Sequence, residues 1–222
     1  LGNERPHLSV PFDWGYDEIF DLIHSKKTLI ANNNHQPVRE KEDIQIFERD
    51  LPGENATGFS KGQTVTFDRP VEQCDVIQKN VWGYRISEKS FRTAEDVVAM
   101  VACAAAKNSN LLMNIGPNGA GELPAQAVTV MQEVGKWFAK NGESIYGTTA
   151  AGVASGKDIV STRKGDVLYL HFLNPEVDQI TFKLDGAVSE AKCLACGKDV
   201  PVSVKDGQAT VKVTRPADCK FD

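Results

Sequence analysis

The chain has 222 residues, a net charge of −5, and ordinary shares of hydrophobic (41%) and charged (25%) residues. This acidic balance, with no basic cluster interleaved with aromatic side chains, argues against a nucleic-acid partner. No apolar run approaches the roughly 18 residues that a membrane-spanning helix needs, so no membrane partner is expected.

Helical and strand-like segments alternate over the first two thirds of the chain. The helical segments are residues 12–24, 93–107 and 124–141, and the strand-like runs are residues 27–37 and 110–116. Thr93 can cap the second helix, and Pro124 suits the first turn of the third, which Asn141-Gly142 should end. Residues 36–70 are polar and rich in glycine and proline, so we expect a long ordered loop there, with a function of its own.

From about residue 150 the pattern changes to short strand-like runs. These runs are residues 165–174, 178–184, 191–196, 200–204 and 208–213. The pair Asp206-Gly207 between the last two runs predicts a hairpin turn. We therefore expect two domains, with residues 1–149 of α/β type and residues 150–222 forming a small all-β domain, a sandwich rather than a barrel.

The five cysteines do not suggest a disulfide framework, because their number is odd and their spacing irregular. Cys193 and Cys196 form a single C-x-x-C. A zinc site needs four ligands, usually from two such pairs or from nearby histidines, and the nearest histidine, His171, stands alone in a strand-like run. The pattern favours a structural or incidental pair over metal or redox chemistry, and no metal site is expected.

The stretch NSNLLMNIGPNGAGELP, residues 108–124, has the outline of a phosphate-binding loop between a strand and a helix. A Walker loop requires G-x-x-x-x-G-K-[ST] and a dinucleotide loop requires G-x-G-x-x-G, and neither pattern is present. Pro117 also removes one N–H group from any anion-binding turn. We therefore interpret the stretch as the C-terminal end of a barrel strand, where active sites of such folds lie. Asn114 would there either brace the neighbouring backbone or contact a substrate.

Carboxylates are the second group of candidates, because hydrolysis of a glycosidic bond needs two of them. Segment 36–70 carries Glu40, Glu42, Asp43, Glu48, Asp50 and Glu54, most of them expected to be solvated surface charges. Glu48 differs because Ile44, Ile46 and Phe47 should half-bury it, and partial burial favours the protonated form that an acid catalyst needs. Glu72 is the other candidate, and spacing alone leaves both open.

Aromatic and imidazole groups complete the set of candidates. Trp82-Gly83-Tyr84 is predicted to be an exposed turn, because glycine is unfavourable inside a strand. Sugars present apolar C–H faces that pack on aromatic rings, so Trp82 is a candidate sugar contact, with core packing as the alternative. His35, at the tip of a predicted strand, could bind a hydroxyl group, although an isolated histidine more often has a structural role.

Six segments together carry a family resemblance. They read FDWGYDEIFDLIH, LIANNNH, EDIQIFERDLPGENATGFS, VEQCDVIQKNVWGYR, NLLMNIGPNGAGELP and VGKWFAKNGESIYGT. In this order and spacing they resemble the α-L-fucosidases of glycoside hydrolase family 29 over most of residues 12–149. The runs N-L-L-x-N-I-G-P and N-G-E-x-I-Y-G are the most specific, and the β-rich tail is similar to the family's C-terminal sandwich but less diagnostic.

The resemblance implies an α/β fold in which residues 1–149 are the C-terminal portion of a (β/α)8-like catalytic barrel and residues 150–222 a β-sandwich. It implies a retaining exo-α-L-fucosidase that acts on fucosylated oligosaccharides or glycoconjugates without a metal or organic cofactor. An Asp nucleophile attacks the anomeric carbon, and a Glu protonates the leaving oxygen and then activates water. Glu48 matches the acid/base, with Glu72 as the fallback, and Trp82 matches the aromatic residue beside the fucose ring.

The chain also departs from the family's pattern. The family often has an Arg near the end of the strand that matches residues 27–37, where this chain reads Asn32-Asn33-Asn34-His35. The contact there, and with it the fine specificity, is expected to differ. The polar candidates for substrate binding are Asn34, His35 and Asn114.

Other family segments have no counterpart in this chain. The stretch that carries the nucleophile and the first barrel strands are absent, and residues 1–18 lack the basic start and apolar core of a signal peptide. We expect that the chain begins after processing or partway through a longer protein, packs against the N-terminal half of the barrel, and works in the periplasm, outside the cell or in lysosomes. The alternatives are a non-catalytic carbohydrate-binding fragment, an inactive paralogue, or a phosphate-binding α/β domain.

Overall fold

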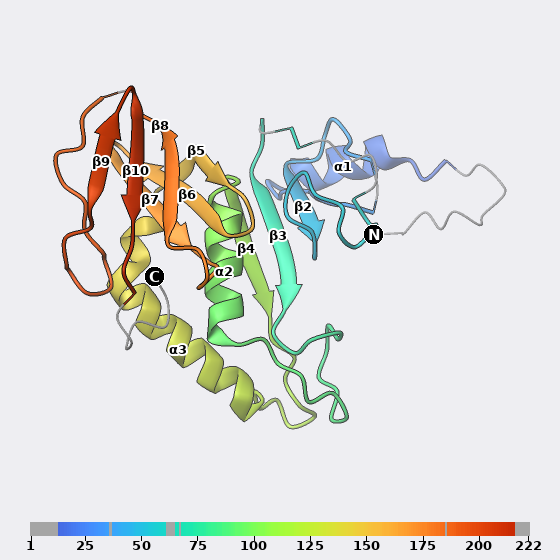
Figure 1. The fold of residues 1–222 in the computed structure, drawn as a ribbon. Coiled ribbons are helices and arrows are strands. Elements are labelled where there is room, and N and C mark those ends of the chain that lie inside the picture. Colours follow the sequence, from blue (N-terminus) through green and yellow to red (C-terminus); the bar gives the residue numbers. More distant parts are fainter. Residues whose placement is uncertain (1–12, 36, 61–64, 67, 185, 216–222) are drawn as a thin grey trace. The chain divides into compact units, whose positions relative to one another are not determined.

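The structure is a computed structural model that describes residues 13–35, 37–60, 65–66, 68–184 and 186–215. The described chain divides into two compact units (Figure 1). One contains the residues up to Asp75 together with Ser109–Asn114, and the other contains Val76–Asn108 and the residues from Ile115 onward. The β-rich region after residue 149 is thus part of a unit that also holds two helices, and the expected domain boundary at residue 149 stays a prediction.

A four-stranded sheet in the order β1-β2-β3-β4 is the frame of the first unit (Figure 1). Its strands are β1 (Ala31–Asn33), β2 (Ile44–Glu48), β3 (Val71–Val76) and β4 (Ser109–Asn114), and helix α1 (Tyr16–Ser25) precedes them. The first three strands are parallel, with Asn33 paired to Ile46 and Glu48 paired to Cys74. Because parallel strands end at the same edge of a sheet, Asn33 and Glu48, the last residues of β1 and β2, lie at one edge.

Strand β2 lies inside the segment for which the sequence predicts a long loop, and that prediction is wrong for residues 44–48. Gln45 and Phe47 are completely buried, whereas Ile44, Ile46 and Glu48 are partly exposed, as expected for a strand with two different faces. The side-chain oxygen of Gln45 accepts a hydrogen bond from the Thr66 backbone at 3.2 Å. A buried glutamine interrupts the apolar alternation, so the strand pattern is hard to recognise in the sequence.

Two of the predicted helices belong to the second unit: α2 (Ala94–Ala105) and α3 (Ala125–Asn141). Thr93 caps α2 as predicted, because its hydroxyl accepts from the Asp96 N–H at 3.1 Å while the Asp96 carboxylate accepts from the Thr93 N–H at 3.0 Å. This reciprocal pair satisfies two backbone donors that a helix start would otherwise leave open. Pro124 precedes α3, and a short 3-10 helix, η1 (Gly142–Ser144), follows it.

The remaining strands form two antiparallel sheets with the orders β5-β6-β7 and β8-β10-β9. They are β5 (Thr149–Ser155), β6 (Ile159–Lys164), β7 (Val167–Phe172), β8 (Gln179–Lys183), β9 (Val202–Lys205) and β10 (Gln208–Lys212). Phe182, Ala209 and Val211 of the second sheet are buried in a cluster that also contains Leu168 and Leu170 of the first. The two sheets therefore share one apolar core.

The predicted hairpin turn is confirmed, and one predicted strand is wrong. Asp206 and Gly207 have φ angles of 51° and 73°, so both adopt the left-handed conformation that the tight turn between β9 and β10 requires. Residues 191–196 do not form a strand: residues 194–196 form a turn, and Lys192 makes an isolated β-bridge to Asp199. Strands β5 and β6 were not predicted, because their alanines, serines and threonines carry little apolar periodicity.

Gly116 fixes a close approach between two loops of the second unit. A Cβ atom at position 116 would lie 2.6 Å from the carbonyl carbon of Gly83 and closer still to the backbone nitrogen of Tyr84. The glycine in the Asn-Ile-Gly-Pro run is therefore required for packing against the Trp82-Gly83-Tyr84 turn, because no other residue lacks a Cβ atom.

We expect Gly116→Ala to lower the free energy of unfolding by about 1–3 kcal/mol, because the added methyl group meets backbone atoms that cannot rotate away. Gly119→Ala is the matched control: a Cβ atom there would have no neighbour within 4 Å, and its effect should stay within about 0.5 kcal/mol. Urea unfolding of the two variants provides the measurement, and equal stabilities would contradict the proposed contact.

Candidate active site

Glu48 ends β2 with its side chain 18% exposed, so the half-burial expected from its apolar neighbours is observed. The side-chain amide of Asn33 donates to Glu48 Oε2 at 3.2 Å, and His35 Nε2 lies 3.5 Å from the same oxygen. Both of these contacts are to Oε2. A carboxyl held in this way can exchange a proton with a bound molecule.

His35 is held beside this carboxyl by its ring and its backbone. Its imidazole packs against the Phe59 ring with 4.2 Å between the ring centroids, and its backbone N–H donates to Asn33 Oδ1 at 3.0 Å. When Nε2 carries a proton, it can donate to Glu48 Oε2 and stabilise the carboxylate form. The structure therefore brings two sequence candidates, His35 and Glu48, together, and adds Asn33 and Phe59.

Asn34 lies beneath Glu48 and is only 1% exposed. Its side-chain oxygen accepts from the Glu48 N–H at 2.9 Å, and its Nδ2 donates to the Glu48 carbonyl at 3.3 Å and to Ser60 Oγ at 2.6 Å. The amide thus bridges the strand end that carries Glu48 and the loop that carries Ser60. A direct contact of Asn34 with a substrate remains a prediction, and its burial favours a structural contribution.

Asp50 supports this bridge through Ser60. Its carboxylate is buried, although most carboxylates of segment 36–70 were expected to be solvated. It is 1% exposed, and its carboxylate accepts from Ser60 Oγ at 2.7 Å, Thr57 Oγ1 at 2.8 Å and the Thr57 N–H at 2.9 Å. Glu42 is also buried, at 6% exposure, and accepts from the Asn32 side chain at 2.9 Å. Buried carboxylates need such donors, because an uncompensated buried charge is costly.

Glu72, the fallback acid, lies on the same face of the sheet as Glu48. It pairs with Ile46 and lies two residues before Cys74, the partner of Glu48, so it sits about 7 Å farther from the strand ends. Burial, followed by the carboxylates of Glu48 and Glu72, raises the pKa of the Cys74 thiol to about 11. This face therefore concentrates negative charge, and the strand-end position favours Glu48 as the group that meets a ligand.

Trp82 and Tyr84 belong to the second unit and lie in a turn, as predicted, at 39% and 40% exposure. The buried side chain of Gln78 holds the loop in place. Its amide nitrogen donates to the carbonyls of Arg85 at 2.9 Å and Glu88 at 2.7 Å, and its oxygen accepts from the Arg85 N–H at 3.1 Å. One glutamine therefore fixes the backbone that presents both aromatic rings.

Four backbone N–H groups of the glycine-rich turn after β4 donate within the turn itself. Asn118 and Gly121 donate to the backbone carbonyls of Glu122 and Asn118 at 2.8 Å and 3.0 Å. Ala120 and Glu122 both donate to the Asn118 side-chain oxygen, at 2.9 Å and 3.0 Å. These N–H groups are unavailable to a phosphate, so the phosphate-loop alternative is further weakened. Asn114 ends β4, at the strand end where it was predicted.

No group of three or more His, Cys, Asp or Glu residues in the described part of the chain could hold a metal ion. His171 is buried in β7, where its Nε2 lies 3.2 Å from Thr162 Oγ1, and burial lowers its pKa to about 4. It is thus a neutral core histidine, bonded within the sheet. Among the described residues, no helix has the length and apolar character needed to cross a bilayer.

A family model described as α-L-fucosidase matches residues 10–143, which is more than half of the chain. The chain belongs to the α-L-fucosidase family. The matched range contains every candidate site residue named above, from the Asn33–His35 strand tip to Asn114.

Individual relatives agree with this assignment. Rat tissue α-L-fucosidase is 29% identical over 142 residues, which cover 60% of this chain and 30% of that protein. α-L-Fucosidase isoenzyme 1 from Paenibacillus thiaminolyticus has a TM-score of 0.73 at 29% identity, covering 92% of this chain and 51% of that one. A GH29 α-L-fucosidase from Bacteroides thetaiotaomicron, solved as a trapped covalent intermediate, has a TM-score of 0.65 at 22% identity, covering 80% and 41%. The chain thus spans about half or less of the length of these relatives.

Proposed function

We propose that this chain is part of a retaining exo-α-L-fucosidase that removes terminal α-L-fucose from glycans or glycoconjugates, with Glu48 as its general acid/base. The observation that carries the proposal is the half-buried carboxyl of Glu48 at the end of a parallel strand, contacted on one oxygen by Asn33 and His35. Membership of the α-L-fucosidase family supplies the substrate class.

In the proposed mechanism, hydrolysis proceeds by two displacements. Glu48 donates its proton to the glycosidic oxygen through Oε1 while an Asp nucleophile, expected in a segment upstream of this chain, attacks the anomeric carbon. The aglycone leaves, and an ester between fucose and the Asp forms. Glu48, now a carboxylate, takes a proton from water, the water attacks the anomeric carbon, and the ester bond breaks. Two inversions retain the configuration.

Asn33 and His35 are proposed to assist the acid/base by charge balance. After proton transfer to the leaving oxygen, Glu48 carries a negative charge, and both groups are placed to donate to its Oε2. Donors to a carboxylate stabilise that form, so they help the first step. Trp82 is proposed to pack on the sugar's apolar face, and His35, Asn34 and Asn114 remain the polar candidates for substrate contact.

The chemistry of one relative also supports a retaining mechanism. The Bacteroides relative was trapped as a covalent intermediate with a 2-fluoro-fucosyl fluoride, which is the kind of species that a double displacement forms. Because that enzyme is only 22% identical, its likeness supports the fold, and the mechanism comes to this chain as a proposal.

We further propose that a (β/α)8-like barrel, completed by an N-terminal half, surrounds this site, and that residues 150–222 form a β-sandwich. β1 and β4 are the outer strands of the four-stranded sheet, and Leu112 on β4 is 46% exposed. Unpaired strand edges and exposed apolar side chains are normally covered. A periplasmic, secreted or lysosomal location stays part of the proposal.

In the complete enzyme, Glu48→Gln should lower the turnover of natural fucosides by roughly 100- to 10,000-fold, because a poor leaving group needs the proton. An activated aryl fucoside, whose leaving group needs little protonation, should form the intermediate at nearly the normal rate. The ratio of kcat/KM for the two substrates is the measurement.

Glu72→Gln is the matched control, since Glu72 shares the sheet face but lies away from the strand end. A selective loss in Glu72→Gln instead would overturn the assignment of Glu48. The absence of any fucosidase activity in the complete wild-type protein would favour the alternative of a carbohydrate-binding fragment or inactive paralogue.

A further inference from the structure

The C-x-x-C stretch forms a closed hairpin in the second unit. Gly197 donates its N–H to the Cys193 carbonyl at 2.8 Å, and Cys193 donates to the Lys198 carbonyl at 2.9 Å. A β-bridge between Lys192 and Asp199 holds the base of the hairpin. The bond from Gly197 to Cys193 closes a tight turn, and Cys196 lies inside this turn.

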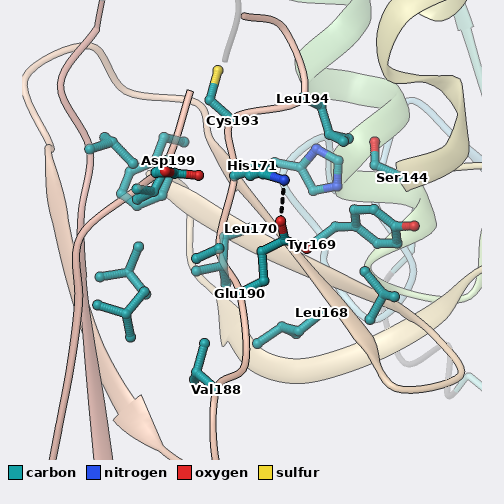
Figure 2. A pocket seen from close by; sticks show the side chains of 18 of the residues that line it. Ser144, Leu168, Tyr169, Leu170, His171, Val188, Glu190, Cys193, Leu194 and Asp199 are labelled. Atoms are coloured by element: carbon teal, nitrogen blue, oxygen red, sulfur yellow. Dashed lines mark ion pairs between the residues drawn. The ribbon is translucent and has the colours of Figure 1, made fainter. Parts of the chain in front are cut away.

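One closed turn therefore contains both Cys193 and Cys196. A disulfide requires Cβ atoms about 3.5–4.5 Å apart, so a bond between them requires the two side chains to approach each other within this turn. Cys196 is exposed and Cys193 is half-buried. Figure 2 shows the Cys193 sulfur pointing away from Leu168 and Leu170, which line a cavity of about 720 Å³ beneath this segment.

We propose that Cys193 and Cys196 are a redox-active dithiol that closes to a disulfide within the hairpin. The Cys196 thiolate attacks one sulfur of a small-molecule disulfide, such as glutathione disulfide, and expels one thiolate. The Cys193 thiolate then attacks the Cys196 sulfur of this mixed disulfide and expels the second thiolate. One small-molecule disulfide is reduced to two thiols as the protein disulfide forms. The sequence alone favours a structural or incidental pair, and the experiment below distinguishes the two.

The test equilibrates the protein in glutathione buffers of increasing oxidised fraction, blocks remaining thiols with an alkylating agent, and measures intact and peptide masses. We expect one intramolecular bond, confined to the peptide that contains Cys193 and Cys196, with a midpoint that follows the buffer ratio. Cys74, whose thiol has a raised pKa, should stay reduced and serves as an internal reference.

Cys196→Ser is the control variant and should instead hold at most a mixed disulfide with glutathione on Cys193. The proposal is overturned if both thiols remain alkylatable in the most oxidising buffer, or if either cysteine pairs with a different one. It is also overturned if the purified protein binds Zn²⁺ through this pair and resists oxidation until the metal is removed.

A buried set of hydrogen bonds supports the backbone of Glu48. Asn34 uses its side-chain oxygen and both amide hydrogens on groups of the protein: the Glu48 N–H, the Glu48 carbonyl and Ser60 Oγ. Ser60 Oγ in turn donates to Asp50 at 2.7 Å. All three side chains, those of Asn34, Ser60 and Asp50, are nearly inaccessible to solvent, at 1%, 4% and 1% exposure. Through Ser60 and Asn34, the buried carboxylate of Asp50 is thus connected to the backbone of Glu48.

We infer that Asn34 is a positioning residue for the acid/base rather than a substrate contact, an inference that rests on the proposed function. Its bonds to both backbone groups of Glu48 fix the direction in which that side chain leaves the strand, and Asp50 holds the amide in its orientation through Ser60. A displacement of about 1 Å in a catalytic group can reduce turnover by about 100-fold.

Asn34→Ala in the complete enzyme should reduce kcat for natural fucosides by roughly 10- to 100-fold while leaving the inhibition constant of free fucose and kcat/KM for an activated aryl fucoside nearly unchanged. Combined with Glu48→Gln, it should add little for natural fucosides, because both changes act through the same carboxyl. Asn110→Ala, at an exposed position of β4, is the control and should behave as wild type.

A weaker binding of fucose with unchanged kcat would instead make Asn34 a substrate contact and overturn the inference. Full additivity of the two variants would do the same. The proposed function fails separately, if Glu48→Gln itself shows no loss that depends on the leaving group. Circular dichroism of each variant identifies any loss of folding, and Ser60→Ala, which keeps the Asn34 amide, should give a smaller loss of kcat in the same direction.

Discussion

The pair of hydrogen bonds between the Asn34 side chain and the backbone of Glu48 is the constraint on which the candidate site depends. It joins the ends of β1 and β2 beyond the last residues that the sheet itself pairs. Behind it, the buried carboxylate of Asp50 accepts three hydrogen bonds from Thr57 and Ser60, in the loop that follows β2. Burial of a charge is costly unless such donors compensate it, so these bonds also connect the loop to the end of β2.

The surroundings of Glu48 fit the acid/base role proposed for it. Its side chain is only 18% exposed, the Asn33 amide donates to its Oε2 at 3.2 Å, and His35 Nε2 lies 3.5 Å from the same oxygen. These contacts hold the carboxyl at the end of a parallel strand, the position where barrel enzymes place their catalytic groups.

The sequence predicted features of the fold and of the site that depend on local chemistry. Thr93 and the Asp206-Gly207 turn follow from capping and backbone rules, and both are confirmed. Half-burial of Glu48 follows from its apolar neighbours. Strand β2 was missed because its buried face carries Gln45, a polar residue whose partner, Thr66, is 21 residues away.

The burial of Asp50 was not predicted, for a related reason. In a polar segment, a carboxylate that will be buried has the same sequence surroundings as one that stays in water, and only the folded loop supplies Ser60 and Thr57. Asn33 was overlooked as a partner of Glu48 because the register between β1 and β2 decides which of the three asparagines faces it. Local sequence patterns do not indicate long-range pairing of this kind.

Chemical rescue of the complete enzyme tests the central claim most directly. With Glu48→Ala and an activated aryl fucoside, azide needs no general base, so it should restore turnover that water cannot. The account predicts a large azide-dependent increase in rate and α-L-fucosyl azide as the product, because the azide attacks the covalent intermediate with a second inversion. No rescue, or a β-L-fucosyl azide product, would contradict the assignment of Glu48 as the acid/base of a retaining fucosidase.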